Sequence, residues 1–246
     1  MGTPQVVDRA LMALGARAAL ARALALAFAA PQGPALGFLV GALAAKVMEV
    51  ATYLEDAPAL RQMAEVLGRA CGDGADLAVE YQRLFRTEMA ASPYETEYGP
   101  QRAARKGPAL ADILGFYEAF GFRPAPAATE LPDHIGAELE FLSLLLVKEA
   151  DARGRGAAEE AAVAGEAARK FFADHLAPWG PAFCRTLGEA ARHPFYVAAA
   201  DLLRIFLEGE ALGLGCPLGE PAPAAPGPAE ECLACPMGPQ VAPAEP

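Results

Sequence analysis

The sequence predicts an all-α protein, a single-domain bundle of about nine to eleven helices followed by a disordered C-terminal tail rich in proline and alanine. Alanine and leucine, which are strong helix formers, dominate the 246 residues, whereas the β-branched residues that sheets prefer are scarce. Glycine and proline interrupt the chain at intervals typical of helix ends, and no convincing strand pattern lies between them. The chain is long enough to bury a substantial core.

The first part of the chain divides at Gly- and Pro-rich breaks. We expect helices there at about 5–30, 35–55, 58–70 and 77–90. Asp76 is expected to be the N-cap of the fourth helix. The first helix carries a short apolar run, but arginines recur along it, so we expect an amphipathic helix and neither a signal peptide nor a membrane span.

The middle of the chain contains two irregular segments. Residues 91–108 lack apolar periodicity and are expected to form a long loop, a feature that is disproportionately functional in compact domains. A Pro/Ala linker is expected at 123–132. Beyond residue 108, helices are predicted at about 109–120, 134–152, 157–176, 178–192 and 194–212. Gly121 is expected to stop the first of these five helices, and the RGRG segment to end the second.

The composition changes beyond Gly215. Residues 216–246 hold nine prolines, four glutamates and no Lys or Arg, which predicts a flexible acidic tail after an α-helical domain spanning 1–215. The net charge of the chain is −11, so subtracting the four tail glutamates leaves −7 on the helical body. This acidity argues against nucleic-acid binding and favours a basic partner.

Enzyme signatures are missing from the sequence. It has no Walker-type phosphate loop, no GxGxxG after a strand, no HExxH and no GxSxG, and it contains only three histidines and two serines. Five unevenly placed cysteines do not make a disulfide scaffold, which favours a reducing, cytoplasmic location. Cys71 and Cys184 are interpreted as buried thiols. Binding is therefore favoured over catalysis.

Two groups of residues are candidates for a binding site. Tyr81, Leu84 and Phe85 share one helical face, which indicates a core stripe as readily as a contact surface. Pro93, Tyr94 and Glu95 lie in the irregular segment, where an aromatic ring with a polar tip suits a peptide and a carboxylate suits a guanidinium.

The second group starts the helix predicted at 134. Asp133 is placed as its N-cap, while His134 and Glu138 add polarity that a simple cap does not need. The carboxylates would suit a short basic peptide. Trp179, the single tryptophan, is interpreted as a core residue. Together these groups predict an acidic and aromatic peptide site.

Several fragments occur in an order that resembles a known family. These are EYQRLF (80–85), PYET (93–96), FYEAFGF (116–122), PDHIGAELEFL (132–142), HLAPW (175–179) and FY (195–196). They resemble the TorD/DmsD/NarJ family of redox-enzyme maturation chaperones over roughly residues 10–210. Glu97-Tyr98-Gly99, which follows PYET directly, resembles sequences of the family branch that serves type II enzymes of the DMSO reductase family.

The resemblance implies a cytoplasmic, non-enzymatic, all-helical chaperone. Its partner would be the twin-arginine leader, or a related N-terminal segment, of a molybdopterin enzyme's catalytic subunit, held back from export until the cofactor is inserted. The implied leader-binding residues are Leu84, Phe85, Pro93, Tyr94, Glu95, Asp133 and His134, to which the charge argument adds Glu138. Charge reversal at Asp133 is then expected to abolish leader binding while helicity persists.

The resemblance also implies a monomer or a helix-swapped dimer, and weak contact with GTP or the molybdopterin cofactor, although no phosphate loop supports nucleotide binding. We expect no resident cofactor. An alternative function depends on Cys216, Cys232 and Cys235, which suggest a metal-binding or redox accessory protein. A single CxxC with one distant cysteine lacks an obvious fourth ligand, so these three residues are weak metal candidates.

Overall fold

A computed structural model describes residues 8–30, 36–54, 57–69, 74–99, 102–123 and 130–220. Every regular element in these ranges is a helix. The α-helices are α1 (Arg9–Ala27), α2 (Leu36–Val50), α3 (Ala57–Arg69), α4 (Gly74–Gln82), α5 (Arg102–Ala119), α6 (Ile135–Gly154), α7 (Ala158–Phe171), α8 (Ala177–Ala190) and α9 (Pro194–Leu214). The π-helical turn η5 (Phe172–Leu176) joins α7 to α8 without a break, leaving eight continuous segments among the described residues. The all-α prediction is confirmed, with slightly fewer helices than expected.

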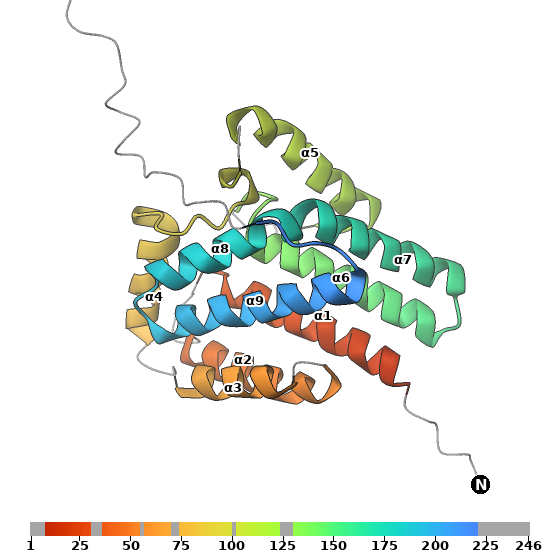
Figure 1. The fold of residues 1–246 in the computed structure, drawn as a ribbon, viewed down its shortest axis with the longest axis horizontal. Helices are drawn as coiled ribbons and strands as arrows, with labels where there is room; N and C mark the ends of the chain where they lie inside the picture. Colours follow the sequence, from red (N-terminus) through yellow and green to blue (C-terminus); the bar gives the residue numbers. More distant parts are fainter. Residues whose placement is uncertain are drawn as a thin grey trace, which may run out of the picture.

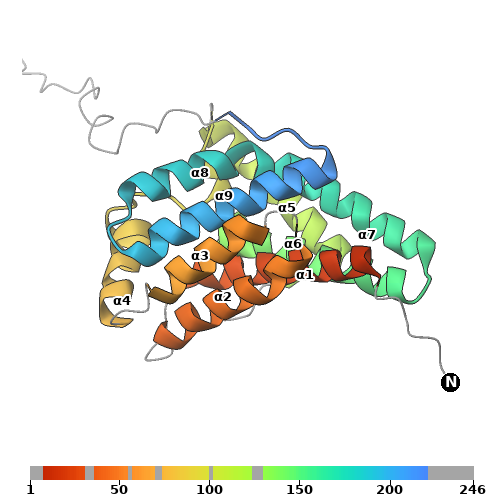
Figure 2. The same cartoon turned by 60° about the horizontal axis from the view of Figure 1, so that its bottom comes forward.

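The helices surround α1 and α6, which pack against each other at the centre of the bundle. Figures 1 and 2 show α2 and α3 as a hairpin that covers one side, where α2 packs on α1 and α3 on α9. On the other side, α7 packs on α6 and α8 on α9. Helix α5 lies at the rim in Figure 1 and is joined to the bundle by aromatic contacts from Phe116 and Tyr117 to Phe141 and Phe171.

Helix α1 is central because it is apolar on most of its circumference. Its buried residues are alanines and leucines, and small alanine side chains let two helices approach closely. At one such approach the Ser143 hydroxyl of α6 donates to the Ala18 carbonyl at 2.8 Å. By length and hydropathy α1 also passes as a candidate membrane span, but half of the tested window is buried inside the bundle. In this structure α1 serves as a core helix.

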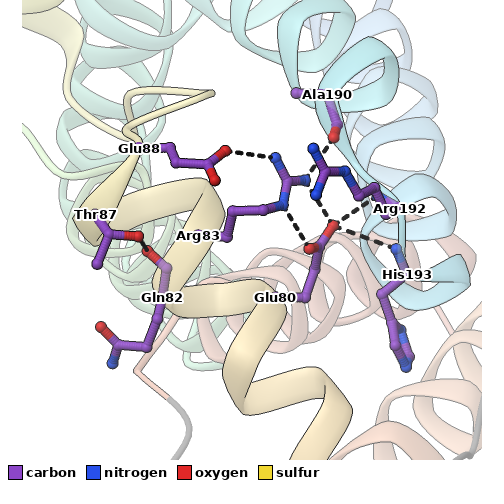
Figure 3. Close-up of polar contacts among 8 residues, drawn as sticks. All are labelled: Glu80, Gln82, Arg83, Thr87, Glu88, Ala190, Arg192 and His193. Carbon is purple, nitrogen blue, oxygen red and sulfur yellow. Dashed lines mark hydrogen bonds and ion pairs between the residues drawn. The ribbon is translucent and has the colours of Figure 1, made fainter.

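The EYQR sequence ties the end of α4 to the α8–α9 turn (Figure 3). The Glu80 carboxylate accepts from Arg83 Nε at 2.8 Å and Nη2 at 2.9 Å, and also from the backbone N–H groups of Arg192 and His193. Arg83 Nη2 donates in turn to the Ala190 carbonyl at 2.6 Å. These hydrogen bonds to its charged form lower the pKa of Glu80 to about 2. The network fixes the π-helical turn η3 (Arg83–Thr87) that follows α4.

Two local predictions in this half of the chain are wrong. Helix α4 begins at Gly74, so Asp76 lies in its first turn and is not the N-cap. Helix α5 begins at Arg102, within the segment predicted as loop. The residues at its start, Ala103 to Lys106, are strong helix formers whatever their apolar pattern, which explains why periodicity alone missed them. Gly121, at φ 69°, ends α5 as expected.

The packed body continues a few residues beyond Gly215. The backbone N–H of Gly219 donates to the Ala177 carbonyl at 2.8 Å, and a Cβ at Gly219 would lie 2.2 Å from the Pro178 carbonyl oxygen. Cys216 is buried beside the end of α9. The remainder of the predicted tail, 221–246, lies outside the described residues, as does Cys71. Cys184 is buried as predicted.

Candidate functional site

Two segments that are some forty residues apart in the sequence pair at one end of α6. Tyr94 and His134 form an isolated antiparallel bridge. The backbone N–H of Ile135 donates to the Pro93 carbonyl at 2.8 Å, and that of Glu95 donates to the Asp133 carbonyl at 3.0 Å. The structure therefore brings together the two segments singled out as binding candidates from the sequence.

Asp133 holds these segments together from inside. Its side chain is 0% exposed, and its Oδ2 accepts from the hydroxyl of Thr96 at 2.7 Å and from the Thr96 backbone N–H at 3.2 Å. The prediction that Asp133 caps α6 is wrong. The N-cap is His134, whose Nδ1 accepts from the Gly136 N–H at 3.0 Å. The Asp133 carboxylate is instead turned toward Thr96.

A second buried carboxyl, Glu138, lies in the first turn of α6. Its Oε2 accepts from the Trp179 indole N–H at 3.2 Å, and the Glu95 carboxyl lies nearby. Burial raises the pKa of Glu138 well above its usual value, and the neighbouring charge of Glu95 adds to this. One oxygen each of Asp133 and Glu138 has no hydrogen-bond partner among the described residues. Glu138 therefore lies in a buried acidic layer, where burial and the nearby carboxylates favour its neutral form.

His175 of η5 completes this layer. Its Nδ1 lies 3.0 Å from Glu95 Oε2, and its Nε2 lies 3.3 Å from Asp112 Oδ2 on α5. The ring also packs against Phe116 and Phe171. The π-helical turn thus places a polar group where α5, α7 and the 3-10 helix η4 (Glu95–Glu97) meet. The buried layer links four elements that are distant in sequence.

An outer layer of side chains reaches solvent beside the paired segments. The Tyr94 hydroxyl donates to Glu130 Oε2 at 2.5 Å, and Arg86 of η3 forms an ion pair with the other Glu130 oxygen. Tyr94 packs edge-on against His134, with ring centroids 5.4 Å apart. Burial and the Glu130 carboxylate raise the pKa of Tyr94. Burial lowers the pKa of His134 to about 4, so its imidazole is neutral near pH 7.

The predicted site residues therefore divide into three groups. Leu84 and Phe85 lie in the core, where Phe85 packs against Tyr81 and Tyr196, so the core-stripe interpretation holds for both. Pro93, Asp133, His134 and Glu138 are buried and position the paired segments. Tyr94 and Glu95 are partly exposed. Trp179 is a core residue, as predicted.

Sequence reasoning missed Glu130, Arg86 and Thr96. Glu130 was assigned to a linker, and nothing local marks it as the partner of an arginine 44 residues away. Thr96 carried a weak signal, because it follows the Pro-aromatic-Glu sequence and has a hydroxyl. Such pairings become visible only when the chain is folded.

No group of three or more His, Cys, Asp or Glu side chains within the described ranges is arranged to hold a metal ion. Cys216 lies among these ranges, whereas Cys232 and Cys235 lie outside them. The metal hypothesis for the three cysteines stays a prediction.

The fold and the candidate site together define a class of protein. The buried polar groups of the site join two irregular segments of an all-helical domain. The surface beside these segments carries both aromatic and charged side chains, which is typical of a binding protein. The comparisons with known proteins agree with this class.

Residues 52–185 match the family model described as nitrate reductase delta subunit. The chain is 36% identical over 141 residues to a chlorate reductase assembly chaperone protein of Ideonella dechloratans, covering 54% of this chain and 68% of the relative. It is 37% identical over 114 residues to a selenate reductase assembly chaperone protein of Thauera selenatis, covering 45% and 57%. It is 29% identical over 150 residues to the chaperone protein TorD of Photobacterium profundum, covering 59% and 65%.

The chain belongs to the TorD/DmsD/NarJ family of assembly chaperones, in which the nitrate reductase delta subunits are included. It is a chaperone of molybdoenzyme maturation and not an enzyme. The alignments span about three fifths to two thirds of the length of these relatives.

Proposed function

We propose that this chaperone binds the twin-arginine leader, or a related N-terminal segment, of a molybdopterin enzyme's catalytic subunit in the cytoplasm. Bound leader is withheld from export until the cofactor has been inserted. The client we propose is a catalytic subunit of the type II branch of the DMSO reductase family, in line with relatives named for chlorate and selenate reductases.

The observation that carries this proposal is the pairing of the Tyr94 and His134 segments. It fixes an aromatic ring with a polar tip and a carboxylate on one surface, and these are the groups that grip an apolar, arginine-bearing peptide. The net charge of −11 on the chain attracts such a peptide at long range.

The burial of Asp133 changes the role we propose for it. Because its side chain is 0% exposed, it supports the leader surface by holding the Thr96 loop, and Tyr94 makes the direct contact. A lysine at position 133 would place an unpaired charge in the interior and disturb the fold. Tyr94 is therefore the better residue to test.

The experiment is co-purification of the tagged chaperone with the client's catalytic subunit, with and without its leader. We expect the wild type to retain the subunit, and retention to fall sharply when the leader is deleted or when Tyr94→Ala is introduced. Tyr53→Ala is the matched control, since Tyr53 is an exposed tyrosine on η2 (Ala51–Tyr53), outside the site. Equal retention with and without the leader would refute leader binding.

A further inference from the structure

The Glu130 carboxylate has the partners that a guanidinium-binding site needs. One oxygen accepts a hydrogen bond from the Tyr94 hydroxyl at 2.5 Å, which orients the carboxylate, and the other is paired with the guanidinium of Arg86. Glu130 is mostly buried, so its charge is shielded from bulk water on most sides. The site is thus already occupied by an arginine, and that arginine belongs to the chaperone itself.

Arg86 is held less firmly than the other arginine of the same π-helical turn. The side chain of Arg83 is 12% exposed and is fixed by Glu80, Glu88 and the Ala190 carbonyl. The side chain of Arg86 is 34% exposed, and besides Glu130 it lies over the Tyr81 ring, 6.0 Å from the centroid. The Arg86 side chain thus has more access to solvent and fewer hydrogen-bond partners than Arg83, so its ion pair can exchange with water or another cation more readily. Arg86 can therefore leave Glu130 without loss of the fold.

Two exposed apolar residues lie close in sequence to the members of this ion pair. Met89 lies just beyond η3, three residues after Arg86, and Leu131 follows Glu130 directly; each is 42% exposed. Met89 has φ 50°, a left-handed conformation that is costly for a residue other than glycine. The turn that it forms lets the Ala91 N–H return to the Leu84 carbonyl at 3.2 Å. An adaptable methionine and a leucine, each next in sequence to the segment that carries one member of the ion pair, are exposed apolar groups that fit a peptide whose arginine has apolar neighbours.

We propose that Glu130 and Tyr94 form a surface site for a client arginine, that Arg86 occupies this site in the free chaperone, and that an arginine of the leader displaces Arg86 on binding. This proposal rests on the proposed function and deepens it, because it names the group recognised and the internal competitor. The occupant is an extended peptide with an arginine beside apolar residues. Met89 and Leu131 supply the apolar contact.

The test is calorimetry with a synthetic peptide of the client's twin-arginine leader. We expect Glu130→Gln to weaken binding by about ten-fold or more, since a charge-assisted hydrogen bond is lost. Arg86→Gln should tighten binding by about two- to five-fold, because a competing surface ion pair is removed. Arg153→Gln is the matched control, since Arg153 is an exposed arginine paired with the largely buried Glu149 on α6, and it should leave affinity unchanged.

If the leader peptide binds Arg86→Gln more weakly than the wild type, or binds Glu130→Gln as tightly, the arginine site at Glu130 is overturned. The proposed function, leader binding by the wild type, would still stand. Thermal melting of each variant checks the fold. If Glu130→Gln does not fold, Tyr94→Phe removes only the orienting hydroxyl and should still weaken binding measurably.

A wild type that binds no leader peptide refutes the proposed function instead. In that case arginine amide is titrated onto the Arg86→Gln protein, with NMR signals of Tyr94 and His134 as the readout. Saturable shifts that Glu130→Gln abolishes support the guanidinium site, and their absence overturns it.

Discussion

The Glu80 network allows a quantitative test of how this fold is held together. The perturbation is Glu80→Gln, which keeps the side-chain size but removes the charge. In the folded protein the pKa of Glu80 is lowered from 4.5 to about 2 by Arg83, Arg192 and His193. This difference in pKa corresponds to about 3 kcal/mol of unfolding free energy near pH 7.

The sign and the pH window follow from the direction of the shift. A lowered folded-state pKa means that the unfolded chain takes up protons first, so the contribution is fully present above about pH 4.5 and is lost as the pH falls toward 2. With the same two pKa values, about 2 kcal/mol should remain at pH 3.5. The destabilisation by Glu80→Gln should shrink accordingly between pH 7 and pH 3.5.

The assay is equilibrium unfolding in urea, followed by circular dichroism at both pH values. Glu166→Gln is the matched control, because Glu166 also binds an arginine three residues on through both oxygens, Arg169 in this case, but on an exposed face of α7. It should leave the unfolding midpoint close to that of the wild type. A loss below about 1 kcal/mol for Glu80→Gln at pH 7, or a loss that does not shrink at pH 3.5, would refute the reasoning.

Two further predictions concern the buried layer of the site. Burial raises the pKa of Glu138 in the fold above that of the unfolded chain, so the wild type loses stability as the pH rises above about 4.5. Glu138→Gln lacks this loss and should be more stable than the wild type at pH 8, with an advantage that fades toward pH 5; urea unfolding at both pH values checks this, and a destabilised variant at pH 8 would contradict it. His134 has a folded pKa of about 4 against 6.5, so it costs the wild type about 3 kcal/mol between pH 7 and pH 4. His134→Asn, which retains an N-cap, should show a correspondingly smaller loss of thermal stability on acidification, and an equal loss would contradict this assignment.

The two candidate segments come together in the fold, whereas several of the side chains named from the sequence lie inside the protein. The segments around Tyr94 and His134 do meet, and Glu138 and Glu95 do lie close together. Asp133, however, points inward to Thr96, and Leu84 and Phe85 belong to the core. Glu130, the carboxylate of the proposed arginine site, is a lone glutamate beside a Pro/Ala segment and has no distinctive local sequence pattern.

Some helix ends likewise follow from the local sequence, whereas others depend on the folded structure. The stop at Gly121 followed from a glycine in the left-handed region, whereas the start of α6 depended on whether Asp133 or His134 faced the first turn. The free N–H groups at the start of a helix can donate to an acceptor atom of either side chain. The choice went to His134 because Asp133 is engaged by Thr96.

The sequence by itself determined that this protein is α-helical, roughly where most helices run and that its surface is acidic, because propensity, punctuation and net charge are local or additive properties. Only the tertiary structure decided which carboxyls are buried, which arginine pairs with Glu130 and which residues reach solvent. Those outcomes depend on contacts between positions tens of residues apart. Burial and electrostatic pairing are set by neighbours in space, and a sequence pattern reports neighbours along the chain.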